Sequence, residues 1–202
     1  MRFLIAGSGG FSKEIADLVY DLGHEVAAFF DERPASVSHE PTGLPVIDDP
    51  GLSDFDAVAV AIGDAIVRER MFARFDGAPM PVLAHPSASV SPSAEIGEGT
   101  LIMHNVVVSA QAKLGRGVIA NVGCYIAHDC RVGAFTHLAA GVNLGGGASV
   151  GERCLCGTGT IVLPRTAVGD RVVVGAGAVV NRDVHDGLVV AGVPARPLAP
   201  AE

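Results

Sequence analysis

From Val90 to Val180 an aliphatic residue recurs at every sixth position without insertion, and only Ala120 and Cys156 interrupt the series. The position four residues after each member is also restricted, because it holds only Ala, Thr, Val or Cys. An α-helix has a period of about 3.6 residues and a strand a period of about two, whereas a hexapeptide period is the signature of a parallel β-helix. The pattern therefore predicts a parallel β-helix in the C-terminal half of the chain.

In such a fold three hexads form one triangular coil of 18 residues, so residues 18 apart in the sequence stack on one another. The series predicts about five coils, stacked roughly 4.8 Å apart around one shared core. Glycines follow the aliphatic position at corners where we expect unusual backbone dihedrals or a close approach of two segments. They are Gly97, Gly115, Gly133, Gly145, Gly151, Gly157, Gly169 and Gly175. The flat outer faces and open ends favour a symmetric trimer.

Residues 1–80 carry a different pattern, in which apolar runs alternate with helical periodicity. We expect strands at Arg2–Ala6, Glu25–Phe30 and 57–62, a helix after the glycine-rich segment 7–10, and a second helix over residues 67–75. Strand–helix alternation is typical of a parallel sheet covered by helices. The sequence thus predicts a small Rossmann-like α/β domain over residues 1–80, followed by a β-helix domain with a C-terminal tail over residues 81–202.

Charge and hydropathy exclude several classes of protein. The formal net charge is −8, and no run of Lys or Arg could neutralise nucleic-acid phosphates, so we expect no nucleic-acid partner. No apolar stretch reaches the length of a membrane span, and the apolar start is too brief for a secretory signal. We therefore expect a cytoplasmic protein without membrane insertion.

The four cysteines occupy restricted positions of the repeat. They are Cys124, Cys130, Cys154 and Cys156. A small, weakly polar side chain suits a buried position, so we interpret all four as core residues. A metal site or a disulfide is the alternative.

Several short motifs accompany the repeat in a fixed order. They are Gly7-Ser8-Gly9-Gly10-Phe11, Asp31-Glu32, Ala61-Ile62-Gly63-Asp64, His85-Pro86-Ser87-Ala88, Ala127-His128-Asp129-Cys130 and Gly192-Val193-Pro194-Ala195-Arg196. Together they resemble the left-handed β-helix (hexapeptide-repeat) acyltransferases. More narrowly, the chain resembles the bacillosamine- and perosamine-type N-acetyltransferases, which belong with the sialic acid O-acetyltransferase-like sugar acyltransferases.

This resemblance implies a left-handed coil and an acyltransferase that uses acetyl-CoA as its co-substrate, with no metal. The acceptor it implies is the C4 amine of a nucleotide-linked amino-deoxy sugar, of the kind used for bacterial surface or protein glycans. It also implies a homotrimer with active sites between subunits.

His128 is the candidate general base. It takes an outward position of its hexad, and the adjacent Asp129 carboxylate favours the protonated imidazole, which strengthens the base. The 18-residue coil places Gly146 and Ala110 next to His128. A strip free of side chains beside a base suits a slender pantetheine arm, so we count Gly146 among the coenzyme-binding residues. The alternative is a solvated histidine beside corner glycines.

The resemblance adds further candidates. It implies that His137 contacts the thioester region of acetyl-CoA, that the backbone at Thr158 and Ala176 contacts the coenzyme, and that Asn121 lies near the base on the substrate side. His104 is off the motif and is expected at the surface.

The glycine-rich segment opens a helix directly after a strand, where free amides and the helix dipole attract phosphate. It lacks the third glycine of a dinucleotide fingerprint, and a tight turn is the alternative. With the resemblance, the expected ligand is the nucleotide sugar. The candidate binding residues are Gly9, Gly10, Phe11, Asp31, Glu32 and Gly63. Lys13 and Arg68 are candidate phosphate cations, and ion pairing at the surface is the equal alternative for both. Phe11 stands where related proteins often carry a histidine.

Three rival functions remain open at this point. A sugar O-acetyltransferase would use the same His–carboxylate pair. A zinc lyase built on a β-helix would need three converging histidines, for which His104, His128 and His137 are the candidates. A non-enzymatic nucleotide-sugar-binding module is the third.

Overall fold

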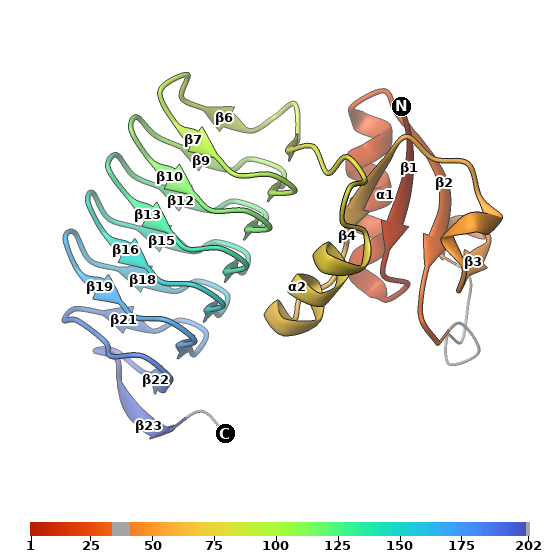
Figure 1. Cartoon of the computed structure of the whole chain (residues 1–202). Coiled ribbons are helices and arrows are strands. Elements are labelled where there is room, and N and C mark those ends of the chain that lie inside the picture. Colours follow the sequence, from red (N-terminus) through yellow and green to blue (C-terminus); the bar gives the residue numbers. More distant parts are fainter. Residues whose placement is uncertain (34–40, 201–202) are drawn as a thin grey trace.

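The computed structural model describes residues 1–33 and 41–200, which form an N-terminal α/β domain beside a three-sided solenoid (Figure 1). Four parallel strands make the N-terminal sheet, in the order β3-β2-β1-β4. Their bounds are β1 Arg2–Ala6, β2 Glu25–Phe30, β3 Val46–Ile47 and β4 Ala57–Val60. Helix α1 (Gly10–Asp21) follows β1, helix α2 (Ala65–Arg74) follows β4, and two 3-10 turns, Pro41–Gly43 and Pro50–Leu52, flank β3. The predicted Rossmann-like sheet is thus confirmed.

Three boundaries differ from the expectation. Strand β4 ends at Val60 rather than at residue 62, and α2 runs from Ala65 to Arg74 rather than from residue 67 to residue 75. The helix begins early because the Asp64 carboxylate caps it and accepts a hydrogen bond from the Val67 N–H at 2.8 Å. A carboxylate at this position satisfies a free amide of the first turn and fixes where the helix starts.

The two faces of the N-terminal sheet pack against different helices. Phe3 and Ile5 of β1 pack with α1, whereas Leu4 and Ala6 point to the opposite face and pack with α2. Helix α1 also lies against the solenoid, since its apolar cluster includes Leu83, Leu101, Met103 and Ile119. The N-terminal domain therefore docks on the solenoid through buried apolar surface.

The solenoid is a left-handed β-helix whose two-residue strands pair in parallel with strands one coil away. Partners are 18 residues apart, as for Lys113 with Arg131 and for Tyr125 with Asn143. The β13 face contains β7 (Glu95–Ile96), β10 (Lys113–Leu114), β13 (Arg131–Val132), β16 (Ser149–Val150) and β19 (Ala167–Val168). The β12 face contains β6 (Ser89–Val90), β9 (Val107–Val108), β12 (Tyr125–Ile126), β15 (Asn143–Leu144), β18 (Ile161–Val162) and β21 (Val179–Val180).

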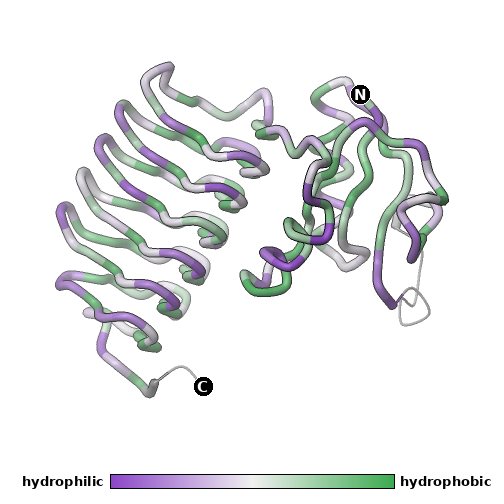
Figure 2. The backbone as a smooth tube through the Cα atoms, viewed as in Figure 1, coloured by the Kyte–Doolittle hydropathy of each residue, from purple (hydrophilic) through white to green (hydrophobic). Residues whose placement is uncertain are grey.

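The third side, the β14 face, carries the N-terminal domain. It contains β5 (Leu83–Ala84), β8 (Leu101–Ile102), β11 (Ile119–Ala120), β14 (His137–Leu138), β17 (Leu155–Cys156), β20 (Val173–Val174), β22 (Leu188–Ala191) and β23 (Arg196–Pro200). Strand β23 pairs antiparallel to β22, so the regular coiling ends there. Figure 2 shows hydrophobic residues along the N-terminal strands, whereas each coil alternates between hydrophobic and polar stretches.

The interior of the solenoid is filled by the aliphatic series and the restricted positions. Three inward threonines, Thr100, Thr136 and Thr160, donate to carbonyls of the next coil, as when Thr136 Oγ1 donates to Gly151 O at 2.6 Å. All four cysteines are free and buried, which confirms their interpretation as core residues. Burial raises the pKa of the Cys124 thiol to about 11, so this thiol stays protonated and unreactive.

Of the two reasons expected for the eight corner glycines, the structure shows the close approach of two coils but not unusual backbone dihedrals. A Cβ on Gly133 would lie 2.5 Å from Glu152 N on the next coil, and each of the other seven would also be too close to a neighbour. None of the eight has a positive φ. The left-handed backbone falls instead two residues later at many corners, at Gly99 and Gly117 and also at non-glycine residues such as Phe135. These glycines therefore allow the coils to pack closely, and an unusual backbone dihedral is not the reason for them.

Gly133→Ala should therefore destabilise the protein by about 1–3 kcal/mol, because the added methyl group must push two coils apart. The free energy of unfolding from denaturant titration measures the effect. Ser149→Ala, on the outer side of the same face, is the matched control and should change stability by less than about 0.5 kcal/mol. Equal stability of the two variants would contradict the role of close coil contact.

Candidate active site

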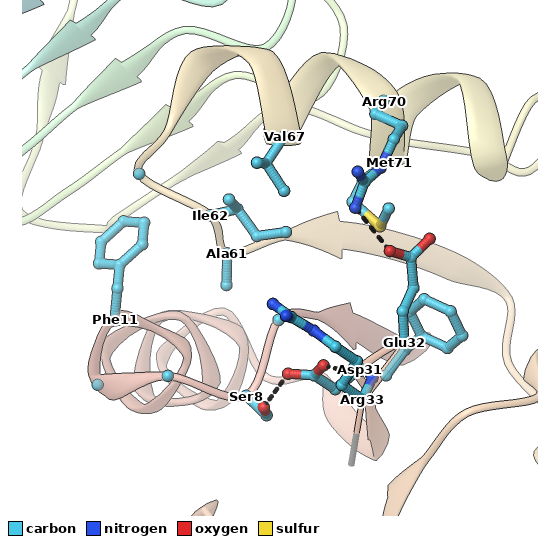
Figure 3. Close-up of a pocket in the computed structure, with 15 residues that line it drawn as sticks. Ser8, Phe11, Asp31, Glu32, Arg33, Ala61, Ile62, Val67, Arg70 and Met71 are labelled. Atoms are coloured by element: carbon cyan, nitrogen blue, oxygen red, sulfur yellow. Dashed lines mark hydrogen bonds and ion pairs between the residues drawn. The ribbon is translucent and has the colours of Figure 1, made fainter. Parts of the chain in front are cut away.

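A pocket of about 350 Å³ lies at the carboxyl ends of β1, β2 and β4 (Figure 3). Ligands of open α/β sheets bind at this edge. The structure brings together six of the residues predicted to bind substrate, because all of them line this pocket: Gly9, Gly10, Phe11, Asp31, Glu32 and Gly63. Asn121 does not line it.

The glycine-rich loop forms one wall of the pocket. Gly7 has φ 123°, and a Cβ there would lie 2.8 Å from Ala61 O, so only glycine fits between the two strand ends. The Ser8 hydroxyl donates to the Asp31 carboxylate, which ties the loop to the end of β2. Gly9 is the N-cap of α1, and open space surrounds both Gly9 and Gly10. A helix start of this kind presents amide N–H groups to an anionic ligand.

The acidic pair at the end of β2 is partly engaged within the protein. Asp31 also accepts the Arg33 N–H at 2.9 Å, and Glu32 pairs with Arg70 of α2 at 2.6 Å across the pocket (Figure 3). Arg33 and Arg70 line the pocket, and the sequence analysis missed both. Helical spacing could have found Arg70, because it lies three residues after Val67, which lines the same wall.

The two cations predicted from the sequence take other places. Arg68 is 1% exposed and donates hydrogen bonds to four backbone carbonyls, so the expectation that it binds phosphate is wrong. Lys13 is exposed on α1 and does not line the pocket. The Arg68 guanidinium lies on the side of α2 that packs against the solenoid. The sequence of α2 does not show that this side of the helix is covered.

His137 lies where the pocket meets the solenoid. Its ring stacks with Phe11 at 6.3 Å between ring centroids, and it contacts Gly63 of the pocket. The Gly63 backbone forms a hydrogen bond with the ring, while the buried Nε2 atom has no partner. Burial, reinforced by the nearby Arg68 charge, lowers the pKa of His137 to about 4, so the ring is neutral at neutral pH. The candidate coenzyme residue thus sits against the N-terminal domain.

His128 and Asp129 stand at the corner between the β12 and β13 faces. His128 Nδ1 and Asp129 Oδ2 are 2.7 Å apart, and the two side chains are 67% and 63% exposed. Asp129 adopts φ 62°, a left-handed backbone conformation that Asp tolerates better than most residues. The hydrogen bond leaves Nε2 of His128 as the open ring nitrogen, accessible to a substrate.

The predicted stacking around His128 is confirmed. Gly147 N donates to His128 O from the coil on one side, and Asp129 N donates to Ala110 O on the other. A Cβ on Gly146 would lie 2.7 Å from His128 Nε2. The absence of a side chain at Gly146 is therefore what gives the imidazole its position.

The remaining coenzyme candidates lie at another corner. Thr158 and Ala176 are exposed between the β14 and β12 faces and stack on each other, with Gly177 N donating to Thr158 O at 2.8 Å. Asn121 is at this corner too, where its Oδ1 accepts the Val122 N–H at 2.7 Å. Within a single chain, these three residues are thus separated from His128 by the width of the β12 face.

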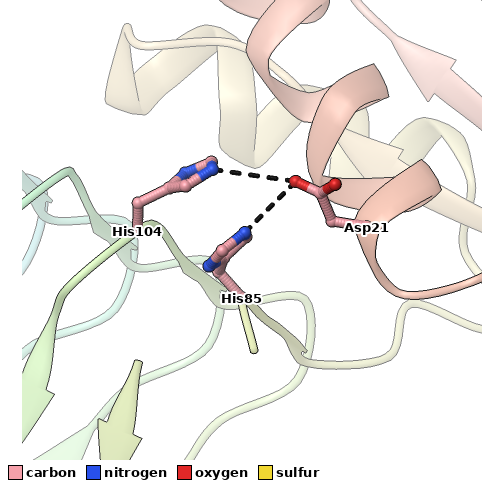
Figure 4. A group of neighbouring side chains, drawn as sticks. All are labelled: Asp21, His85 and His104. Carbon is pink, nitrogen blue, oxygen red and sulfur yellow. Dashed lines mark hydrogen bonds and ion pairs between the residues drawn. The ribbon is translucent and has the colours of Figure 1, made fainter. Parts of the chain in front are cut away.

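A second group of titratable residues joins the domains (Figure 4). His85 Nε2 is 3.1 Å and His104 Nε2 is 3.7 Å from Asp21 Oδ2, and the two rings stack at 3.6 Å. Ser87 N–H donates to His85 Nδ1, so the proton of the neutral ring sits on Nε2 and points at the Asp21 carboxylate. In this tautomer Nε2 is a hydrogen-bond donor rather than a metal ligand. His104, expected at the surface, is partly exposed within this contact.

Within one chain, the histidines that a zinc lyase would need do not converge. Within residues 1–33 and 41–200, the group of three ligand-type side chains with atoms within 4.8 Å is Asp21, His85 and His104. His128 and His137 stand at a corner and on the β14 face, each with other partners.

Comparison with known proteins places these features in a family. Residues 2–75 match the PglD N-terminal domain. A perosamine N-acetyltransferase variant from Caulobacter crescentus, in complex with CoA and GDP-perosamine, is 36% identical with a TM-score of 0.92, covering 98% of this chain and 97% of that one. The acetyltransferase domain of PglB from Neisseria gonorrhoeae FA1090 is 38% identical with a TM-score of 0.90, covering 98% and 99%. WeeI from Acinetobacter baumannii AYE is 26% identical with a TM-score of 0.68, covering 98% and 100%.

Gly146→Ala tests the geometry of the corner. The new methyl group must displace the His128 ring, and a misplacement of about 1 Å can cost about 100-fold in rate. We therefore expect kcat to fall by about that factor while the melting temperature stays unchanged, since an exposed ring can swing into solvent. Ser149→Ala, on the same coil, is the control. A kcat within twofold of wild type would show that the ring is not needed in this place.

Proposed function

The chain belongs to the bacillosamine- and perosamine-type N-acetyltransferases with a left-handed β-helix, and from this we propose that it transfers the acetyl group of acetyl-CoA to the C4 amine of a nucleotide-linked amino sugar. The observation that carries the assignment of the base is the 2.7 Å hydrogen bond between His128 Nδ1 and Asp129, which leaves His128 Nε2 against the side-chain-free Gly146. Residues 1–80 bind the nucleotide sugar in this proposal, and residues 81–202 hold the coenzyme.

His128 acts as the general base. Its Nδ1–H donates to Asp129, so the Nε2 lone pair accepts the proton of the amine as the nitrogen attacks the thioester carbonyl. Backbone amides of the coil stabilise the negative oxygen of the tetrahedral intermediate. The C–S bond then breaks, coenzyme A leaves as its thiolate, and the imidazolium returns a proton to the sulfur. Asp129 keeps the ring oriented and stabilises the imidazolium formed during the reaction.

The active form in this proposal is a homotrimer with the site between subunits. In one chain the His128 corner and the corner of Thr158 and Ala176 lie on opposite edges of the β12 face. In the trimer, the His128 corner of one subunit lies beside the Thr158 corner of the next, so one coenzyme contacts both. The outer side of the β12 face supports this arrangement, because Val107, Tyr125 and Ile161 expose 36%, 41% and 39% of their surface. Exposed apolar residues gathered on one face mark an interaction surface.

The proposed location is the cytoplasm. No helix among the described residues is long and apolar enough to cross a membrane. Acetyl-CoA and nucleotide sugars are both cytoplasmic metabolites, so an enzyme that consumes both acts in that compartment.

Replacing the base should abolish most of the turnover. We expect His128→Ala to lower kcat by about 10²–10⁴-fold, the usual contribution of a general base, while the affinity for coenzyme A stays near that of wild type. Asp129→Asn should lower kcat less, by about 10-fold or about 1.4 kcal/mol in the barrier. The assay follows coenzyme A release with GDP-perosamine and other nucleotide 4-amino sugars as acceptors.

Mass spectrometry with fragmentation of the product separates an amide on the sugar nitrogen from an ester on a hydroxyl. An ester product would support the O-acetyltransferase alternative, and near-normal kcat for His128→Ala would remove His128 from the mechanism.

The trimer has its own test. Ile161→Glu places a charge on the apolar β12 face, and we expect sedimentation velocity to report a smaller species together with lost activity. Ser149→Glu puts the same charge on the β13 face and should leave the oligomer intact. A monomeric wild-type protein with full activity would refute the shared site.

A further inference from the structure

Arg68 is a buried cation for which no ion pair within 4 Å is present among the described residues, and the Asp64 carboxylate acts on it only through a longer-range charge interaction that raises its pKa. It is 1% exposed, and burial lowers its pKa to about 10, so the guanidinium remains charged at neutral pH. Removing such a charge from water is costly unless hydrogen bonds replace the lost hydration. Here backbone carbonyls supply all the replacements.

Those carbonyls come from two parts of the molecule. Nη1 donates to Ile62 O at 2.7 Å and to Gly63 O at 2.8 Å, both in the segment that follows β4 and lines the nucleotide-sugar pocket. Nε donates to Gly117 O at 2.8 Å, and Nη2 donates to Phe135 O. The last two residues stack on adjacent coils at the corner between the β13 and β14 faces.

We propose that Arg68 is a positioning residue of the acetyl transfer, which fixes the Ile62–Gly63 wall of the nucleotide-sugar pocket to the β-helix and so sets where the sugar amine lies. This inference rests on the proposed function, since it assumes that the pocket holds the acceptor. Five N–H donors in a planar fork can reach carbonyls of both domains at once, which a lysine ammonium on a flexible stem cannot do with the same geometry.

The same wall is held from its other side by His137. The ring contacts Gly63 and stacks with Phe11, so Gly63 lies between Arg68 and His137. His137 follows Phe135 by two residues on the same coil, so both contacts tie the pocket to one element of the solenoid. The pocket wall therefore cannot shift without breaking contacts to that coil.

The neighbouring residue provides a matched control. Glu69 also joins α2 to the solenoid, through hydrogen bonds of 2.7 and 2.6 Å from Arg153, but it contacts neither Ile62 nor Gly63. Both interactions hold the domains together, but of these two α2 residues only Arg68 has a hydrogen bond to the pocket wall. A variant at Glu69 weakens the domain interface without loosening the acceptor site.

The experiment compares R68K with E69Q in steady-state assays of the full-length protein, with GDP-perosamine or the best acceptor of the panel. We expect R68K to lower kcat/KM for the acceptor by about 10–100-fold while KM for acetyl-CoA changes less than twofold. E69Q should lower the melting temperature but keep acceptor kcat/KM within twofold of wild type. The proposal is wrong if R68K keeps acceptor kcat/KM within twofold, or if E69Q lowers it as much as R68K does.

A second measurement separates the charge of Arg68 from its geometry. In R68M the ring of His137 loses a nearby positive charge, so its pKa should rise above about 4, while burial, the larger cause, still holds it below the usual value; R68K should leave it near 4. Titration of the His137 ring protons by NMR reads this directly and needs no turnover. An unchanged His137 pKa in R68M would show that the Arg68 charge does not act on His137 across Gly63, and would contradict the joint hold of the two residues on the pocket wall.

NMR of the unmodified protein guards against variants that fail to fold. Added GDP or UDP should shift the Arg68 Nε–H and His137 ring signals if the pocket wall responds to its ligand, and acetyl-CoA alone should not shift the Arg68 signal. Binding of a nucleotide without either shift would overturn the proposal. If no acceptor is acetylated by wild type, the proposed function fails, and these signals still decide whether Arg68 couples to the pocket.

Discussion

The hydrogen bonding of each coil to the coil 18 residues earlier is the constraint from which the C-terminal half of this protein follows. It decides which residues are neighbours. Gly146 matters for the site because this stacking places it beside His128, where a side chain would collide with the imidazole. The same ladder brings coils so close at some corners that a Cβ on Gly133 would collide with backbone. The glycines that permit stacking and the glycine that clears the base therefore have one physical origin.

Strict periodicity is also why so much could be predicted from the sequence. A fixed coil length converts separation along the chain into adjacency in space, which placed Ala110 and Gly146 around His128 and put the cysteines in the core. The backbone dihedrals were harder to predict. Positive φ values fall at residues such as Asp129 and Phe135 rather than at the eight corner glycines. Those glycines are needed because two coils pack too closely there for a Cβ, and their backbone is not left-handed.

The contacts between the domains were not predictable, because no repeat governs them. In the sequence Arg68 cannot be told from an exposed cation of a helix. Its acceptors are backbone carbonyls such as Gly117 O, and every residue has a carbonyl, so the sequence does not show which of them accept. His137 could be assigned an outward position on its coil, but whether that position faces solvent or another domain depends on how α1 and the segment after β4 dock. Sequence reasoning thus placed six residues that line the pocket, but it missed Arg33 and Arg70 and the contacts that hold the pocket against the solenoid.

Acetyl transfer requires the thioester of acetyl-CoA and the amine of the bound sugar to come within bonding distance. The solenoid has no part that could move to adjust this distance. Its coils are locked to one another along three faces, so the position of the acceptor has to be set where the N-terminal domain docks. A carboxylate partner for Arg68 would neutralise its charge but leave the carbonyls of Ile62 and Phe135 without donors in a buried interface. A lone guanidinium satisfies those carbonyls together, and so joins the pocket wall to the solenoid more directly than a surface ion pair such as that of Glu69 with Arg153.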